Sequence, residues 1–138
     1  MYKSILVTLD TTPTDRVIIE HIKLLAKEMQ SNVVLLHVAT GVPAQWSGAD
    51  AAGKEIDEDS AYLTKVEAEF QAAGISAKAE LGFGDPVTEI VKWVDEKGCD
   101  LVAMGTHGHG LLADMFFGTT AVRVQHSISV PVLLLRAR

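Results

Sequence analysis

Near-continuous apolar runs of strand length are the feature that most constrains how this chain can fold. The strongest of them cover residues 4–9, 32–38, 101–104 and 131–135. A strand that is apolar along its whole length has both faces buried, which is typical of a parallel sheet with helices on each side. Between these runs, apolar residues recur at helical spacing, as Ile18, Ile22 and Leu25 do. In the helix expected at residues 54–73, the same spacing assigns to the inner face Ile56, Leu63, Val66 and Phe70. The sequence therefore predicts strands that alternate with helices.

Five strands and four helices can be placed from these patterns and from the residues that end them. We expect strands at residues 4–9, 32–38, 75–81, 101–104 and 131–135, and helices at residues 13–29, 54–73, 86–97 and 119–126. Proline, glycine and acidic residues mark the helix ends, with Asp85 as an N-cap and Gly98 after a last turn. This alternation predicts an α/β fold, in which helices on both faces cover an open parallel sheet with right-handed crossovers.

The segment of residues 101–120 carries the clearest sign of a ligand site. Its apolar strand leads into three glycines and two threonines, with two residues between the first two glycines and nine before the third: Gly105, Gly108, Gly118, Thr119 and Thr120. Glycines let backbone N–H groups approach an anion closely, and a helix N-terminus adds further donors and a positive dipole end. The segment therefore predicts a binding site for the phosphates of a nucleotide.

Length and charge narrow the possible classes of protein. The chain has 138 residues, which suits one domain over residues 1–138. Its net charge of −6 disfavours non-specific binding to nucleic acid or to acidic membranes, since both require a basic surface. No apolar run is long enough to span a membrane, and the first residues lack the layout of a signal peptide. We therefore expect a cytoplasmic protein that binds neither nucleic acid nor membrane.

The glycine spacing and the two ends of the chain together resemble the nucleotide-binding subgroup of the universal stress protein family. The similarity runs from the strand at residues 5–10 to residues 130–136. The subgroup's signature is glycine, two residues, glycine, nine residues, glycine and then Ser or Thr, and residues 105–119 meet it without a gap. The resemblance implies a flavodoxin-like sheet of strand order 3-2-1-4-5. In such a sheet ligands bind beyond the carboxyl ends of the strands, where the order reverses between strands one and four.

The resemblance also implies an adenine nucleotide, usually ATP, together with Mg²⁺ or Mn²⁺. Asp10 would meet the ribose and adenine side, and the backbone of Val38 would pair with the adenine edge. The residues implied to line the base and nucleoside pocket are Thr8, Leu9, Asp10, Val38, Met104 and Gly105. Those implied to lie at the phosphates are His107, Gly108, His109, Gly118, Thr119 and Thr120. A homodimer joined through the last strand, Val130–Leu135, is implied as well.

The predicted phosphate loop has no Lys or Arg between its first and last glycines. Fast phosphoryl transfer needs a group that positions water and a cation that stabilises the transferred charge. We therefore predict a nucleotide-dependent regulatory protein of the stress response, with moderate affinity and no dedicated catalytic residue. Two alternatives stay open: a slow ATPase or nucleotide-processing enzyme assisted by Asp114 or His109, and a dimeric interaction scaffold that ignores nucleotide.

His107 and His109 also have a spacing that can ligate zinc, with His37 as a third ligand from another strand. A zinc site normally needs three or four ligands with matched supporting hydrogen bonds. The sequence does not fix the distance of His37 from the other two histidines, so we predict no dedicated metal site. His37 is interpreted as a partly buried strand histidine.

Overall fold

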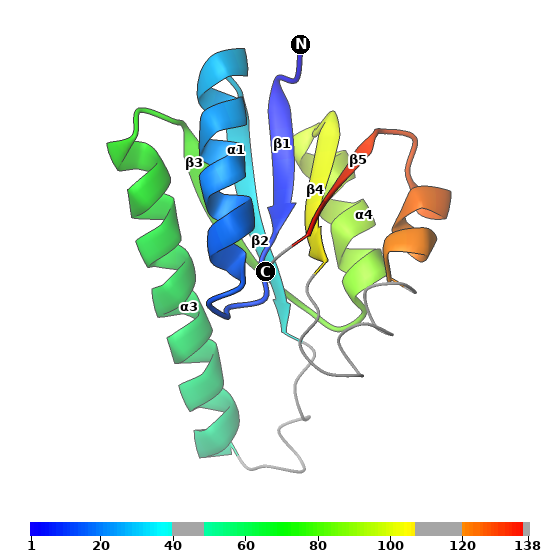
Figure 1. The fold of residues 1–138 in the computed structure, drawn as a ribbon. Helices are drawn as coiled ribbons and strands as arrows, with labels where there is room; N and C mark the ends of the chain where they lie inside the picture. Colours follow the sequence, from blue (N-terminus) through cyan, green and yellow to red (C-terminus); the bar gives the residue numbers. More distant parts are fainter. Residues whose placement is uncertain (40–48, 107–119, 137–138) are drawn as a thin grey trace.

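Five parallel strands form one sheet in the order β3-β2-β1-β4-β5 (Figure 1). The computed structural model describes residues 1–39, 49–106 and 120–136. The strands are β1 (Ser4–Thr8), β2 (Asn32–Ala39), β3 (Ala77–Phe83), β4 (Leu101–Thr106) and β5 (Val132–Arg136). The helices are α1 (Asp15–Met29), α3 (Ala49–Ala72) and α4 (Pro86–Lys97), and residues 120–127 are also helical. The predicted α/β fold and strand order are confirmed.

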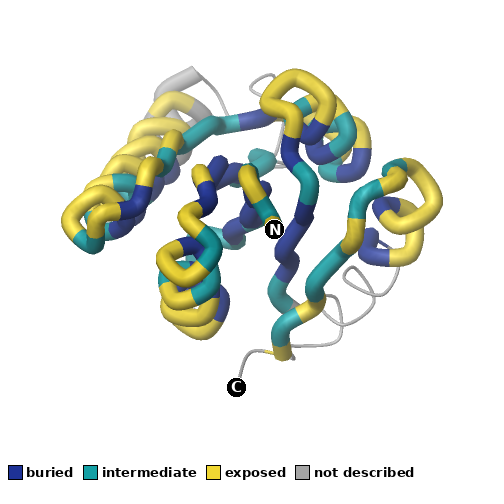
Figure 2. The backbone as a smooth tube through the Cα atoms, turned by 90° about the horizontal axis from the view of Figure 1, so that it is seen from above, coloured by how far each residue is buried: buried dark blue, intermediate teal, exposed yellow. Residues whose placement is uncertain are grey.

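Two apolar layers hold the helices against opposite faces of the sheet. On one face, α1 and α3 contribute buried residues such as Ile22 and Phe70. On the other face, α4 and the helix of residues 120–127 contribute Ile90 and Val124. Figure 2 shows that the outward surfaces of the helices are exposed while the central strands between them are buried. The helices are therefore amphipathic, as their spacing predicts.

β1 shows why the apolar runs are continuous. Ile5 and Val7 pack in the layer with α1 and α3, whereas Leu6 packs in the layer with α4. Successive side chains of a strand point to opposite faces, so a strand covered on both sides needs an apolar residue at each position. All three side chains are fully buried.

The start of α1 differs from the predicted boundary. The helix begins at Asp15 instead of residue 13. Residues 12–14 form a turn in which the N–H of Asp15 donates to the Thr12 carbonyl across 3.0 Å. The Asp15 side chain is consequently available for contacts outside the helix, and the functional site uses it.

The length of α3 also differs from the prediction. It begins at Ala49 instead of residue 54, and Figure 1 shows its first turns extending past the carboxyl ends of the strands. Leu63, Val66 and Phe70 are buried against the sheet as predicted, but Ile56 is 37% exposed. Helical spacing identifies an apolar stripe but cannot show where the sheet beneath it ends. The assignment of Ile56 to the inner face was therefore wrong.

The remaining element ends lie close to their predicted positions. Asp85 is the N-cap of α4, and its carboxylate accepts from the Thr88 N–H across 3.0 Å. Gly98 follows α4 with a φ of 63°, a left-handed conformation that favours glycine. β3 begins and ends two residues later than predicted, and β5 one residue later at each end. Among the helices of the described ranges, none combines the length and the apolar character that crossing a membrane requires.

Candidate functional site

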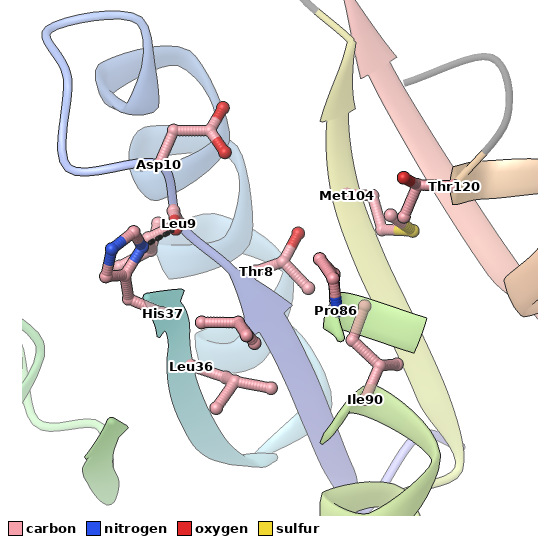
Figure 3. A pocket seen from close by; sticks show the side chains of 10 residues that line it. Thr8, Leu9, Asp10, Leu36, His37, Pro86, Ile90, Met104 and Thr120 are labelled. Carbon is pink, nitrogen blue, oxygen red and sulfur yellow. Dashed lines mark hydrogen bonds between the residues drawn. The ribbon is translucent and has the colours of Figure 1, made fainter. Parts of the chain in front are cut away.

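A cavity of about 200 Å³ opens beyond the carboxyl ends of β1, β2 and β4 (Figure 3). The residues that line it come from these strands, from the turn after β1, from the start of α4 and from the helix of residues 120–127: Thr8, Leu9, Asp10, Leu36, His37, Val38, Pro86, Ile90, Met104 and Thr120. β1 pairs with β2 on one side and with β4 on the other. The cavity therefore lies at the point where the strand order reverses, which is the usual ligand position in open α/β sheets.

Most of the predicted base-side residues are brought together here. The predicted residues that line the cavity are Thr8, Leu9, Asp10, Val38, Met104 and Thr120. Gly105 follows Met104 in β4 and pairs with Leu135 of β5, outside the lining set. A Cβ at Gly105 would come no closer than 4.0 Å to the Leu135 carbonyl oxygen, so packing against β5 does not require glycine there. The predicted phosphate-side residues His107, Gly108, His109, Gly118 and Thr119 lie outside the described residues.

Four lining residues were not predicted to belong to the site: Leu36, His37, Pro86 and Ile90. Leu36 and Ile90 are buried and form an apolar wall with Met104. Pro86 is the first residue of α4, which begins beyond the end of β3. A sequence signal for the two α4 residues did exist, because the N-cap at Asp85 places the start of that helix at the carboxyl end of the sheet.

The turn after β1 carries Asp10 and is held by a buried carboxylate. The side chain of Asp15, a residue that is only 4% exposed, accepts from the Asp10 N–H across 2.9 Å and from the Thr11 N–H across 2.8 Å. Thr11 has a φ of 63°, which is uncommon for a β-branched residue. Burying a carboxylate is costly unless hydrogen bonds satisfy it, and these two backbone donors do so. The turn and the start of α1 are therefore one hydrogen-bonded unit.

Tyr62 of α3 contributes a third hydrogen bond to the same carboxylate. Its hydroxyl donates to Oδ2 of Asp15 across 2.7 Å. Burial, reinforced by this hydrogen bond, raises the pKa of Tyr62 well above its usual value. The hydroxyl consequently stays protonated and remains a donor at any physiological pH.

His37 connects the end of β2 to the same turn from its other side. Its Nδ1 donates to the Leu9 carbonyl across 2.7 Å, because a carbonyl oxygen can only accept. Its Nε2 lies 3.4 Å from Oδ2 of Asp59 on α3, and Asp59 is 8% exposed. Partly buried in its strand, His37 is placed as the sequence suggested. Within the described ranges, no group of three His, Cys, Asp or Glu side chains could hold a metal ion, and the other two histidines of the zinc alternative lie outside those ranges.

The helix of residues 120–127 reaches the cavity through Thr120, which is 6% exposed. Arg123 of this helix lies 3.4 Å from Oδ1 of Asp85, the N-cap of α4. The pKa of Asp85 is lowered by its hydrogen bonds to Thr88 and, to a smaller extent, by Arg123. This ion pair links the two helices that border the cavity on the α4 face of the sheet.

Comparison with known proteins gives matches over nearly the whole chain. A sequence model of the universal stress protein family matches residues 1–136. Universal stress protein MJ0531 of Methanocaldococcus jannaschii is 28% identical over 141 residues, which cover 99% of this chain and 83% of that protein. The solved structure of MJ0577, a universal stress protein of the same organism, has a TM-score of 0.83 at 26% identity, covering 100% of this chain and 98% of that one.

A universal stress protein of Archaeoglobus fulgidus, solved in complex with dAMP, shares the fold at lower identity. Its TM-score is 0.70 at 18% identity, covering 96% of this chain and 97% of that one.

Proposed function

Because the chain belongs to the universal stress protein family, we propose that it binds an adenine nucleotide, with ATP as the first candidate, in the cavity beyond β1, β2 and β4. The bound nucleotide would act as a regulatory ligand of a stress-response protein. The observation that carries this proposal is that backbone N–H and C=O groups of β2 point toward the cavity. An acidic side chain and an apolar wall lie beside them.

The backbone N–H and C=O of Val38 face the cavity side of β2. The N–H of Leu9 donates to the Leu36 carbonyl across 2.8 Å, so the backbone groups of Leu36 point toward β1. The Ala39 carbonyl accepts from the Gly84 N–H, on the opposite side of the strand. Backbone groups of successive strand residues alternate in direction, so those of Val38 point as those of Leu36 do, beyond the end of β1. A donor beside an acceptor suits the N1 and 6-amino groups of adenine.

The other lining groups match the remaining parts of a nucleoside. Leu36, Ile90 and Met104 are buried apolar side chains against which a base could stack. Figure 3 shows the Asp10 carboxylate directed away from His37 and toward the side of β4. A carboxylate accepts hydrogen bonds, which suits ribose hydroxyls. The dAMP complex of the Archaeoglobus fulgidus protein supports the choice of an adenine nucleotide.

The phosphates would extend from the nucleoside toward Thr120 and the glycine segment. The cavity of about 200 Å³ is smaller than the roughly 300–1,000 Å³ of a site for a drug-sized ligand, so it suits the nucleoside part alone. Thr120 is the first described residue of the helix of residues 120–127, and the glycine spacing directly precedes it in the sequence. Mg²⁺ or Mn²⁺ would arrive bound to the phosphates of the nucleotide.

Calorimetric titration of the purified protein with ATP, ADP, AMP and dAMP tests the proposal. The matched variants are Asp10→Asn, in the cavity, and Asp95→Asn, on the exposed surface of α4. We expect the wild type and Asp95→Asn to bind equally well, and Asp10→Asn to bind at least about tenfold more weakly, since it loses a charged acceptor. Absence of binding of all four nucleotides to the wild type at millimolar concentration would exclude the proposed function.

A slow ATPase remains the second candidate at the same site. The ionisable groups among the described lining residues are Asp10 and His37, and the Nδ1–H of His37 is engaged by the Leu9 carbonyl. Turnover of labelled ATP with Mg²⁺ or Mn²⁺ discriminates the two functions. Product formation that disappears in a Gly118→Val variant would favour the enzyme over the regulatory binder.

The two edges of the sheet differ in how they are covered, and this difference favours a homodimer through β5. The edge of β3 is covered by α3, because Glu67 accepts from the Ala79 N–H across 2.7 Å and Gln71 donates to the Ala77 carbonyl across 3.3 Å. β5, at the other end of the sheet, leaves Leu134 41% exposed, and an apolar groove lies between it and α1. Proteins usually cover such apolar strand edges, and a second copy of β5 would cover this one.

A further inference from the structure

Beyond the residues that line the cavity, we propose that Tyr62 and Asp15 are positioning residues of the nucleotide site. They hold the turn at Asp10 and Thr11 in one conformation before the ligand arrives, and so set the position of the Asp10 side chain. The inference rests on the proposed function, because Asp10 matters as a ligand contact only if a nucleotide binds there.

The backbone of the turn is strained, and a specific side chain stabilises this strained conformation. Thr11 adopts a φ of 63°, although β-branched residues disfavour the left-handed region. Such a conformation persists only where the surroundings over-determine it, and it is concentrated at functional sites. Here the two oxygens of the Asp15 carboxylate accept the N–H groups of Asp10 and Thr11 at 2.9 and 2.8 Å. The carboxylate thus selects the conformation that puts Asp10 at the cavity.

The carboxylate is itself oriented from another element. Tyr62 lies 47 positions further along the chain, on α3, and its hydroxyl donates to Oδ2 of Asp15 across 2.7 Å. Without this donor the buried carboxylate could rotate, and its two backbone partners would lose a fixed acceptor. The position of Asp10 therefore depends on a helix that contributes no side chain to the described lining of the cavity.

A second contact of α3 lies near the residue before Asp10. Asp59 lies beside Nε2 of His37 at 3.4 Å, and Nδ1 of His37 donates to the Leu9 carbonyl across 2.7 Å. Asp59 and Tyr62 are three residues apart, so they project from the same face of α3. α3 therefore contacts both parts of the turn: its Tyr62 hydroxyl is bonded to Asp15, and its Asp59 lies beside the histidine that is bonded to the Leu9 carbonyl.

This arrangement makes nucleotide affinity depend on one hydrogen bond between α3 and the start of α1. Any ligand that favours one geometry of the turn must, by linkage, also stabilise the contacts that maintain it. Nucleotide binding should consequently strengthen the hydrogen bond between Tyr62 and Asp15, and loss of this hydrogen bond should weaken binding.

The test compares Tyr62→Phe, which removes one hydroxyl, with two controls. Tyr2→Phe makes the same chemical change on a half-buried tyrosine next to the amino end of β1, and Val66→Ala destabilises α3 without touching the network. We expect Tyr62→Phe to weaken ATP binding about tenfold and both controls to bind as the wild type does. In nucleotide-free protein, amide exchange at Asp10 and Thr11, read by NMR, should be faster in Tyr62→Phe than in either control.

Equal binding of ATP by the wild type and Tyr62→Phe would overturn the inference, and so would an equal loss of affinity in Tyr62→Phe and Val66→Ala. Unchanged amide exchange at Asp10 and Thr11 in Tyr62→Phe would overturn it as well, because the turn would then not depend on the hydroxyl. A wild-type protein that binds no ATP would instead count against the proposed function. That result comes from the wild-type protein and not from the comparison of variants. A failure of the proposed function can therefore be distinguished from a failure of this inference.

Discussion

Nδ1 of His37, at the end of β2, donates a 2.7 Å hydrogen bond to the carbonyl oxygen of Leu9, directly after β1. The bond spans the gap that opens where β1 ends and β2 continues, and both residues line the cavity. The floor of the candidate site is therefore held by a side chain in addition to the sheet's backbone ladder.

Two substitutions of His37 distinguish the contribution of its hydrogen bond to the Leu9 carbonyl from that of the volume of its ring. His37→Asn keeps a donor N–H close to the position of Nδ1, whereas His37→Leu removes it. We expect ATP affinity within about threefold of the wild type for Asn and roughly tenfold weaker for Leu, because the Leu9 carbonyl then lacks its donor. Calorimetric titration measures both. If the two variants bind ATP equally, the hydrogen bond does not contribute to the site.

Asp15→Ala should destabilise the fold as well as the turn. The substitution leaves three donors without their acceptor: the N–H groups of Asp10 and Thr11 and the hydroxyl of Tyr62. We expect the free energy of unfolding to fall by about 2–4 kcal/mol, the cost of removing a buried hydrogen-bonded group. Urea denaturation measures this change. Asp95→Ala, at an exposed position of α4, should change stability by less than about 0.5 kcal/mol.

Acid should weaken the link between α1 and α3. Glu69 lies 2.6 Å from Arg16 and 3.0 Å from Lys23. The hydrogen bond from Arg16 lowers the pKa of Glu69 below its ordinary value, Lys23 adds to this, and partial burial opposes it. A carboxyl whose pKa is lower in the folded state stabilises the fold above its unfolded pKa, and this contribution is lost as the pH falls through the folded value.

Glu69→Gln therefore has a defined effect on the pH profile of stability. At neutral pH it should lower the free energy of unfolding by at most about 1 kcal/mol, as expected for a pair near the surface. Below about pH 4 the difference from the wild type should shrink, because the wild-type carboxyl becomes protonated too. Urea denaturation at a series of pH values checks this. A difference that grows toward low pH would contradict the assignment.

Leu134→Glu tests the assembly through β5. Placing a charge on the exposed face of this strand should prevent two copies from joining there, since a buried charge without a partner is costly. We expect light scattering at micromolar concentration to give a dimer mass for the wild type and a monomer mass for the variant. Ile56→Glu, at an exposed position of α3, should remain dimeric. A wild-type monomer would exclude the β5 dimer under these conditions.

Several features of the fold and site were predictable because they depend on local pattern. Continuous apolar runs predicted the strands, since both faces of β1 and β2 are covered, and helical spacing predicted the buried stripe of α4. Asp10, Val38 and Met104 were implied by their positions at strand ends within a resembled family, and the structure places them around one cavity. The glycine segment that prompted the nucleotide prediction lies largely outside the described residues, so the phosphate side remains a prediction.

What only the tertiary structure decided is which polar side chains support that cavity. In the sequence, Asp15 looks like an ordinary acidic residue at the start of a helix. Tyr62 looks like a partly apolar residue on another helix. Their hydrogen bond exists because α1 and α3 pack side by side on the same face of the sheet. Periodicity determines which side of a helix is buried, since burial depends on local spacing. The partner of a buried polar group depends on how separate elements dock, and that is settled only when the whole chain is folded.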